Sequence, residues 1–164
     1  MSDSLTDSTA GSEDKAASVP PVSLSPETVG RMRSLGLPVI VPHWLPEGFS
    51  LKKATADRDP LSGAFSEIHL EAPTGAFVQI CVTAEGVGDV FRGATRHSFA
   101  NPFFGSAALE WYEDEEEGVD FRSPWLPVSN DAFPVLLAAG RGLSPEEAVR
   151  VVESLRSVNT RNVS

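Results

Sequence analysis

The sequence contains a single cysteine, Cys81, among its 164 residues. One cysteine excludes an intramolecular disulfide and any metal site that needs several cysteines. Its neighbours Val78, Ile80 and Val82 indicate a buried strand. We therefore interpret Cys81 as a small residue of the core.

Positive charge is also scarce, with 13 Lys and Arg against 23 Asp and Glu, which gives a net charge of −10. This balance argues against nucleic acid and against anionic membrane surfaces, because both need clustered cations. No run reaches the roughly 18 apolar residues of a membrane span. The first residues lack the basic and apolar regions of a signal peptide. We expect a soluble cytoplasmic protein without membrane insertion.

The three histidines, His43, His69 and His97, lie on different predicted elements, and none has a second ligand at metal spacing. On one predicted strand, Glu67, His69 and Glu71 share a face and could in principle hold a metal. A solvated polar face explains the same pattern. We therefore predict no metal site and no cofactor.

Motifs for catalysis are missing as well. The acidic run at residues 113–117 lacks the spaced oxygen pattern and central glycine of a calcium loop, so a charged hairpin tip explains it better. The segment Gly86-Val87-Gly88-Asp89 lacks the third glycine and the lysine of a phosphate loop. There is no Gly-x-Ser-x-Gly motif. We find no catalytic constellation and predict that the protein is not an enzyme.

The composition predicts one domain with two irregular ends. Residues 1–22 are rich in Ser, Thr, Asp and Ala, with little apolar surface to offset the entropy of ordering. We predict a disordered tail there, a single domain at 23–158, and a frayed C-terminus at 159–164.

The most distinctive stretch is Val41-Pro42-His43-Trp44-Leu45-Pro46-Glu47-Gly48-Phe49. Proline fixes φ and has no N–H, so this stretch is neither helix interior nor central strand. We predict an extended lead-in that turns at residues 46–48 and largely buries Trp44. This structural clamp would consist of Pro42, Trp44, Pro46, Gly48 and Phe49.

Local signals predict the other elements. A helix starts at Ser25 and Pro26 and ends at Gly36. Strands are predicted at 49–57, 64–71 and 76–83, the last two forming a hairpin by their alternation.

The second half of the chain predicts another hairpin, from residues 106–113 and 119–123. Residues 133–139 favour a strand, with a helix as the alternative. Ser144 and Glu147 form a capping box, and Pro145 suits the first helical position, so an amphipathic helix begins there. Hairpins followed by such a helix indicate an α+β fold, with a mostly antiparallel sheet and the C-terminal helix packed on one face.

Residues 85–105 contain several glycines and large apolar side chains, and they predict a long loop, although a short helix or strand within 89–99 fits equally well. Phe91, Phe99, Phe103 and Phe104 are our candidate contact residues for a partner. Exposed aromatic residues on a loop can dominate binding affinity. In the alternative interpretation, these rings fold back and cover the open face of the sheet.

The segment Pro42-His43-Trp44-Leu45-Pro46-Glu47-Gly48-Phe49 resembles the Pro-x-x-Leu-Pro-x-Gly-Phe/Tyr opening of DUF4367-type domains, a bacterial and archaeal family of unknown function. The resemblance extends over residues 41–157, through a strand with Trp111 and a final helix with Ser154-Leu155. Many such domains resemble extracytoplasmic modules behind a membrane anchor. The family implies no catalytic residues.

Two functions remain open from the sequence. The first is a non-enzymatic binding or assembly module that contacts a protein partner. The second is a carrier of a small apolar ligand, with a pocket between the sheet and the C-terminal helix. A hydrolytic or metal-dependent enzyme is the third and least supported interpretation.

Overall fold

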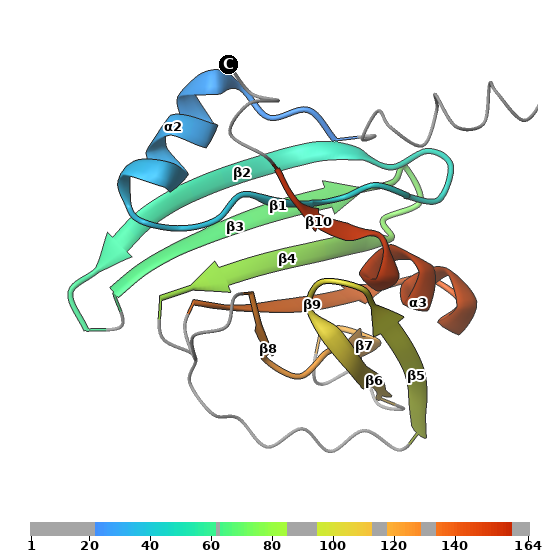
Figure 1. Cartoon of the computed structure of the whole chain (residues 1–164). Coiled ribbons are helices and arrows are strands. Elements are labelled where there is room, and N and C mark those ends of the chain that lie inside the picture. Colours follow the sequence, from blue (N-terminus) through green and yellow to red (C-terminus); the bar gives the residue numbers. More distant parts are fainter. Residues whose placement is uncertain (1–21, 62, 85–94, 113–117, 129–133, 159–164) are drawn as a thin grey trace, which may run out of the picture.

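The computed structural model describes residues 22–61, 63–84, 95–112, 118–128 and 134–158. Within them the chain forms an α+β fold with antiparallel strands, as the sequence predicts (Figure 1). Residues 1–21 of the predicted tail, the C-terminal residues 159–164 and the acidic run at 113–117 lie outside the described residues. Val22, the last residue of the predicted tail, is buried in the core, so it belongs to the domain.

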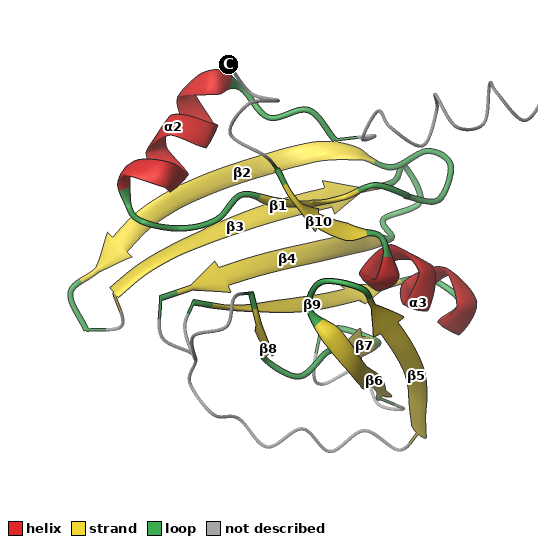
Figure 2. Ribbon diagram, viewed as in Figure 1, coloured by secondary structure: helices red, strands yellow, loops and turns green. Residues whose placement is uncertain are grey.

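The main sheet has the strand order β2-β3-β4-β9-β7-β6-β5, and β8 pairs with β9 (Figure 2). Its strands are β2 (Ser50–Asp59), β3 (Gly63–Glu71), β4 (Phe77–Thr83), β5 (Thr95–Asn101), β6 (Gly105–Trp111), β7 (Phe121–Arg122), β8 (Leu126–Pro127) and β9 (Val135–Arg141). A separate ribbon pairs β1 (Ile40–Pro42) with β10 (Leu155–Ser157). The helices are α2 (Pro26–Ser34) and α3 (Pro145–Glu153).

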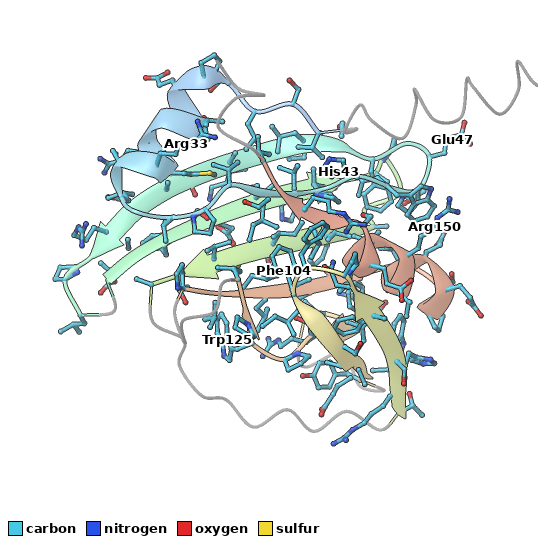
Figure 3. The ribbon with its side chains drawn as sticks, viewed as in Figure 1. Arg33, His43, Glu47, Phe104, Trp125 and Arg150 are labelled. Atoms are coloured by element: carbon cyan, nitrogen blue, oxygen red, sulfur yellow. The ribbon has the colours of Figure 1, made fainter. Side chains whose placement is uncertain are left out.

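The hydrophobic core joins the helices, the β1–β10 ribbon and the main sheet. Met32 of α2, Val41 of β1 and Val151 of α3 belong to one buried cluster with the inward residues of β3 and β4. In Figure 3, Phe104 lies near the middle of the molecule, whereas Glu47 and Arg150 lie at its edge. The C-terminal helix therefore contributes its apolar face to a shared core.

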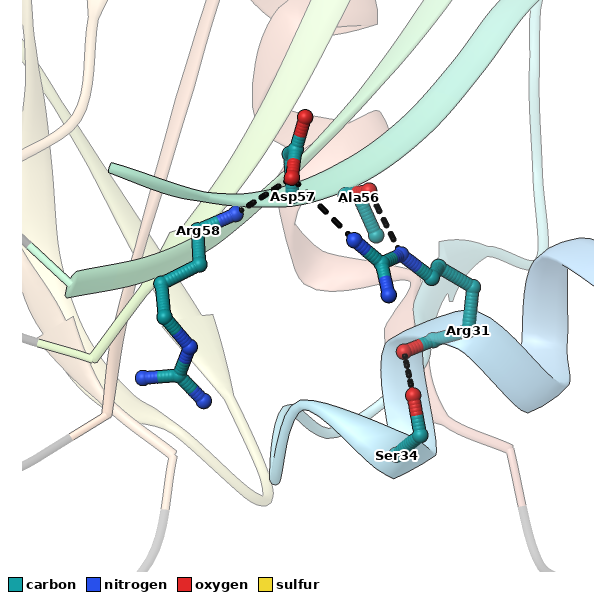
Figure 4. A network of polar contacts seen from close by, with 5 residues as sticks. All are labelled: Arg31, Ser34, Ala56, Asp57 and Arg58. Atoms are coloured by element: carbon teal, nitrogen blue, oxygen red, sulfur yellow. Dashed lines mark hydrogen bonds and ion pairs between the residues drawn. The ribbon is translucent and has the colours of Figure 1, made fainter. Parts of the chain in front are cut away.

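Helix α2 starts and ends where the sequence predicts. The Ser25 hydroxyl accepts a hydrogen bond from the Thr28 N–H at 3.1 Å. The Arg31 side chain reaches β2, where it forms an ion pair with Asp57 at 3.1 Å and donates to the Ala56 carbonyl at 3.3 Å (Figure 4). These contacts hold the helix beside an edge strand of the sheet.

The predicted β3–β4 hairpin is confirmed, with the predicted residues on its buried face. Ile68 pairs with Ile80, and both are at most 2% exposed. Cys81, next in the strand, points to the opposite face and is only partly buried. The interpretation of Cys81 as a small residue of the core is wrong, because alternation places it on the opposite face from Val78, Ile80 and Val82.

The proline-rich clamp follows β1 and ends in a turn at residues 47–48. Pro42 is buried and pairs with Leu155 in the β1–β10 ribbon, a pairing that the sequence did not predict. Trp44 is only partly buried, and so are Pro46 and Phe49, while Gly48 is exposed. Trp44 nonetheless packs against the hydrophobic core, which agrees with a largely buried position.

The predicted loop at 85–105 contains a strand. β5 begins at Thr95 and pairs with β6 as a hairpin through a short turn at residues 102–104. Residues 85–94, including Phe91, lie outside the described residues. The strand within 89–99 that the sequence left open therefore begins late in that range, at residue 95.

The strand that the sequence favoured at residues 133–139 is confirmed as β9. It continues past Gly140, where a side chain would clash with the Phe121 ring at 2.8 Å. Helix α3 has the predicted capping box at Ser144 and Glu147. The helix ends at Glu153, so Leu155 belongs to β10 instead of the helical stripe.

Candidate binding site at the end of helix α3

The C-terminal end of α3 is capped by a residue from the β5–β6 turn. A helix leaves its last carbonyl groups without partners inside the helix. The side-chain amide of Asn101 donates to the carbonyl oxygens of Val152 at 2.9 Å, Leu155 at 3.1 Å and Glu153 at 3.3 Å. Asn101 is 4% exposed, so these bonds lie away from water.

The same asparagine fixes the turn that follows it. Its side-chain oxygen accepts hydrogen bonds from the N–H groups of Phe103 at 2.9 Å and Phe104 at 3.1 Å. Gly105 closes the turn at φ +103°, which glycine adopts without strain. The turn therefore holds the two neighbouring phenylalanines in defined and opposite environments.

Phe104 points inward and is 6% exposed, whereas the Phe103 side chain is 67% exposed. Phe99, on β5, is 3% exposed and belongs to the core. The burial of Phe99 and Phe104 favours the alternative interpretation, in which these rings cover the core. Phe103 is the strongly exposed one of the described candidates, and Phe91 lies outside the described residues.

Arg156 of β10 lies against the exposed ring. Its guanidinium carbon is 5.1 Å from the centre of the Phe103 ring, within the range of a cation–π interaction. Its Nη1 donates to the Glu153 carbonyl at 2.7 Å and to the Leu155 carbonyl at 2.8 Å. The negative end of the helix dipole therefore holds the positive guanidinium in a fixed orientation.

A pocket of about 240 Å³ opens beside this pair and is lined by Phe103, Phe104, Val128, Arg156 and Ser157. The lining combines aromatic, aliphatic, hydroxyl and cationic groups. Such a mixture suits a ligand that is partly apolar and carries an acceptor or a negative charge.

The helix end also holds the proline-rich clamp. The Ser154 hydroxyl accepts hydrogen bonds from the N–H groups of His43 and Trp44, each at 3.1 Å. The guanidinium of Arg150 lies 4.3 Å from the centre of the Trp44 ring. The clamp is thus fixed by polar and cation–π contacts in addition to its partial burial.

Two further pockets adjoin Arg96 on β5, with volumes of about 310 Å³ and 190 Å³. Arg96 forms an ion pair with Glu110 at 3.4 Å. Its charge is therefore already balanced, and neither pocket is lined by a strongly exposed aromatic ring. The site beside Phe103 is the stronger candidate.

The polar face of β3 forms hydrogen bonds within the strand and to β4. His69 Nε2 lies 3.2 Å from Glu71 Oε1, and the amide of Gln79 donates to Glu67 at 2.6 Å. The His69 ring stacks on Phe77 with centres 5.2 Å apart. Among the described residues no group of three or more His, Cys, Asp or Glu side chains could hold a metal ion.

The Cys81 thiol is poorly suited to act as a nucleophile. Burial raises its pKa from 9.0 to about 11, the negative charge of Glu67 adds to this effect, and Arg122 opposes it. A thiol with this pKa is almost fully protonated at neutral pH, and the thiolate is the reactive form.

Sequence reasoning missed Asn101 and Arg156, the two residues that shape the site. Asn101 precedes a proline, which is a turn signal but does not reveal what the side chain caps. Arg156 looks like an ordinary charge on the solvent side of the last helix.

Within the described residues, no helix is long and apolar enough to span a membrane.

The chain matches no protein-family model, no curated protein and no solved structure. The resemblance to DUF4367-type domains therefore stays a prediction. A proposal for its function can therefore use only the contacts, burial and charges of the described residues.

Proposed function

We propose that the protein is a non-enzymatic binding module that contacts a protein partner through Phe103. The observation that supports this proposal is the 67% exposure of a phenylalanine whose backbone is held in place by a buried asparagine. A ring on a preorganised turn loses little entropy on binding, and aromatic residues are common energetic centres of interfaces.

The exposure of Phe103 differs from ordinary surface exposure. Leu61 is the other large apolar residue that is strongly exposed in the described part of the chain, at 97%. Single exposed apolar side chains are normal on proteins. Phe103 is distinguished by its neighbours, because it borders a pocket and stacks with Arg156.

The test compares affinity capture by the wild-type protein, Phe103→Ala and Leu61→Ala from a lysate of the native host, with quantitative mass spectrometry. We expect Phe103→Ala to lose a partner that the wild type and Leu61→Ala both retain. Leu61→Ala is a matched control because it also removes an exposed apolar side chain from a turn. Equal recovery by all three proteins would refute the proposal.

The alternative function, an apolar ligand carrier, needs space between the sheet and α3. Ala148, Val151 and Val152 of α3 are completely buried in the core cluster. The pocket of about 310 Å³ between β5 and α3 is lined in part by the charged residues Arg96 and Glu146, so it suits an apolar ligand poorly. The packing of α3 therefore favours the binding module, and native mass spectrometry of the purified protein would reveal a retained ligand.

A further inference from the structure

We propose that the pocket beside Phe103 accepts an acidic side chain of the protein partner, bound by Arg156, while a neighbouring apolar group of the partner covers the Phe103 ring. This inference rests on the proposed function and names the chemistry of the partner. It rests on the N–H groups of Arg156, because some of them already donate hydrogen bonds within the protein and others have no partner among the described residues.

The fold uses one edge of the guanidinium. Arg156 has five N–H donors, and Nη1 donates to the carbonyls of Glu153 and Leu155 at 2.7 and 2.8 Å. The Nε and Nη2 donors have no partner among the described residues. Since a carboxylate binds an arginine through two neighbouring nitrogens, the Nε–Nη2 edge is suited to a bidentate contact.

Helix capping alone explains the Nη1 bonds, but among the described residues no carboxylate pairs with this guanidinium. The nearby carboxylate of Glu153 accepts the Ala100 N–H at 2.8 Å, which is a separate contact. The described contacts of Arg156 are with carbonyl oxygens and with the Phe103 ring. A partner carboxylate would supply a full negative charge, which none of these contacts does.

The surroundings also favour a carboxylate that belongs to a larger apolar group. Arg156 is partly buried, so its interactions are less screened than those of a fully exposed side chain. Phe103, Phe104 and Val128 line the same pocket of about 240 Å³. The net charge of −10 permits this contact, because charges farther away than about 8 Å are largely screened at physiological salt.

The direct test titrates the isotope-labelled full chain with two blocked peptides, observed by NMR. In one peptide a glutamate is flanked by leucines, and in the other a glutamine replaces the glutamate. We expect the glutamate peptide to shift the amide signals of Phe103 and Ser157 and to bind roughly tenfold more tightly, as a charge-assisted bidentate contact does. Equal binding of the two peptides, or no shift at these positions, would overturn the inference.

A third peptide, with a free C-terminal carboxylate and no acidic side chain, separates the two sources of a carboxylate. Binding as tight as that of the glutamate peptide would overturn the choice of an acidic side chain. Weaker binding supports it.

Variants assign the contact to Arg156. Arg156→Lys keeps the charge and can still donate to the helix carbonyls, but it lacks the planar fork. We expect it to keep the wild-type melting temperature and to bind the glutamate peptide roughly tenfold more weakly. Arg96→Lys is the matched control, since this arginine is paired with Glu110. Equal losses in both variants would count against the assignment.

The two proposals fail in different ways. If Phe103→Ala abolishes partner capture while Arg156→Lys leaves capture and peptide binding unchanged, the binding surface stands and the carboxylate inference is refuted. If Phe103→Ala leaves capture unchanged, the proposed function itself is refuted.

Discussion

Replacing Asn101 with alanine should be one of the most damaging single changes in this domain. The side chain forms five hydrogen bonds, two to the last carbonyls of α3, one to the Leu155 carbonyl of β10 and two to the β5–β6 turn. Each hydrogen bond contributes about 1 kcal/mol net, and a buried carbonyl left without a partner costs about 1–3 kcal/mol. We expect Asn101→Ala to lower the free energy of unfolding by about 3–5 kcal/mol.

The measurement is urea denaturation of the wild type and the variant, followed by tryptophan fluorescence and circular dichroism. Ser98→Ala is a matched control, because Ser98 is an exposed polar residue on the same strand. It should change the free energy of unfolding by no more than about 0.5 kcal/mol. A loss below about 1 kcal/mol in Asn101→Ala would refute the capping argument.

Asn101→Asp separates the two halves of the contact. Aspartate has almost the same shape and still accepts hydrogen bonds from the Phe103 and Phe104 amides. It cannot donate to the helix carbonyls, and its negative charge lies at the negative end of the helix dipole. We therefore expect Asn101→Asp to be at least as unstable as Asn101→Ala at neutral pH, and wild-type stability would contradict the assigned geometry.

Three further predictions follow from burial and contacts. Phe104→Ala should cost about 3–5 kcal/mol of stability, whereas Phe103→Ala should stay within about 1 kcal/mol, as measured by urea denaturation. Because folding raises the pKa of Cys81 from 9.0 to about 11, alkylation of its thiol at pH 8 should be far slower than in the unfolded chain. For the same reason the free energy of unfolding should fall as pH rises from 9.0 to about 11, where the unfolded thiol ionises before the folded one. Trp44→Ala and Arg150→Ala should be non-additive by at least about 0.5 kcal/mol in a double-mutant cycle, because the Arg150 guanidinium lies over the Trp44 ring.

The features predicted correctly from the sequence depend on neighbouring residues. The Ser144 capping box and the start of α2 at Ser25 each involve residues three apart, and both are present. The β3–β4 hairpin follows from alternation and a short turn. In these places the residues that form the contact are close together in the sequence. The local sequence was therefore sufficient to predict the structure.

What the sequence did not predict depends on contacts between distant segments. The apolar chemistry of Trp44 predicted its burial, but not its contacts with Arg150 and with the Ser154 hydroxyl, 110 residues away. The glycines of residues 85–105 favoured a loop and left a short strand open, and pairing with β6 gives a strand from Thr95. There, tertiary pairing decides between alternatives that local propensity left open.

The candidate site depends entirely on such distant contacts. Asn101 reaches the Val152 carbonyl across 51 residues, and without this bond nothing in the local sequence separates an exposed Phe103 from a buried Phe104. The end of α3 therefore organises two segments: it holds the clamp through Ser154 and the β5–β6 turn through Asn101. If Phe103 is a contact residue, its position is a property of the helix end, so substitutions at Asn101 should weaken partner binding even though its side chain is buried and touches no partner.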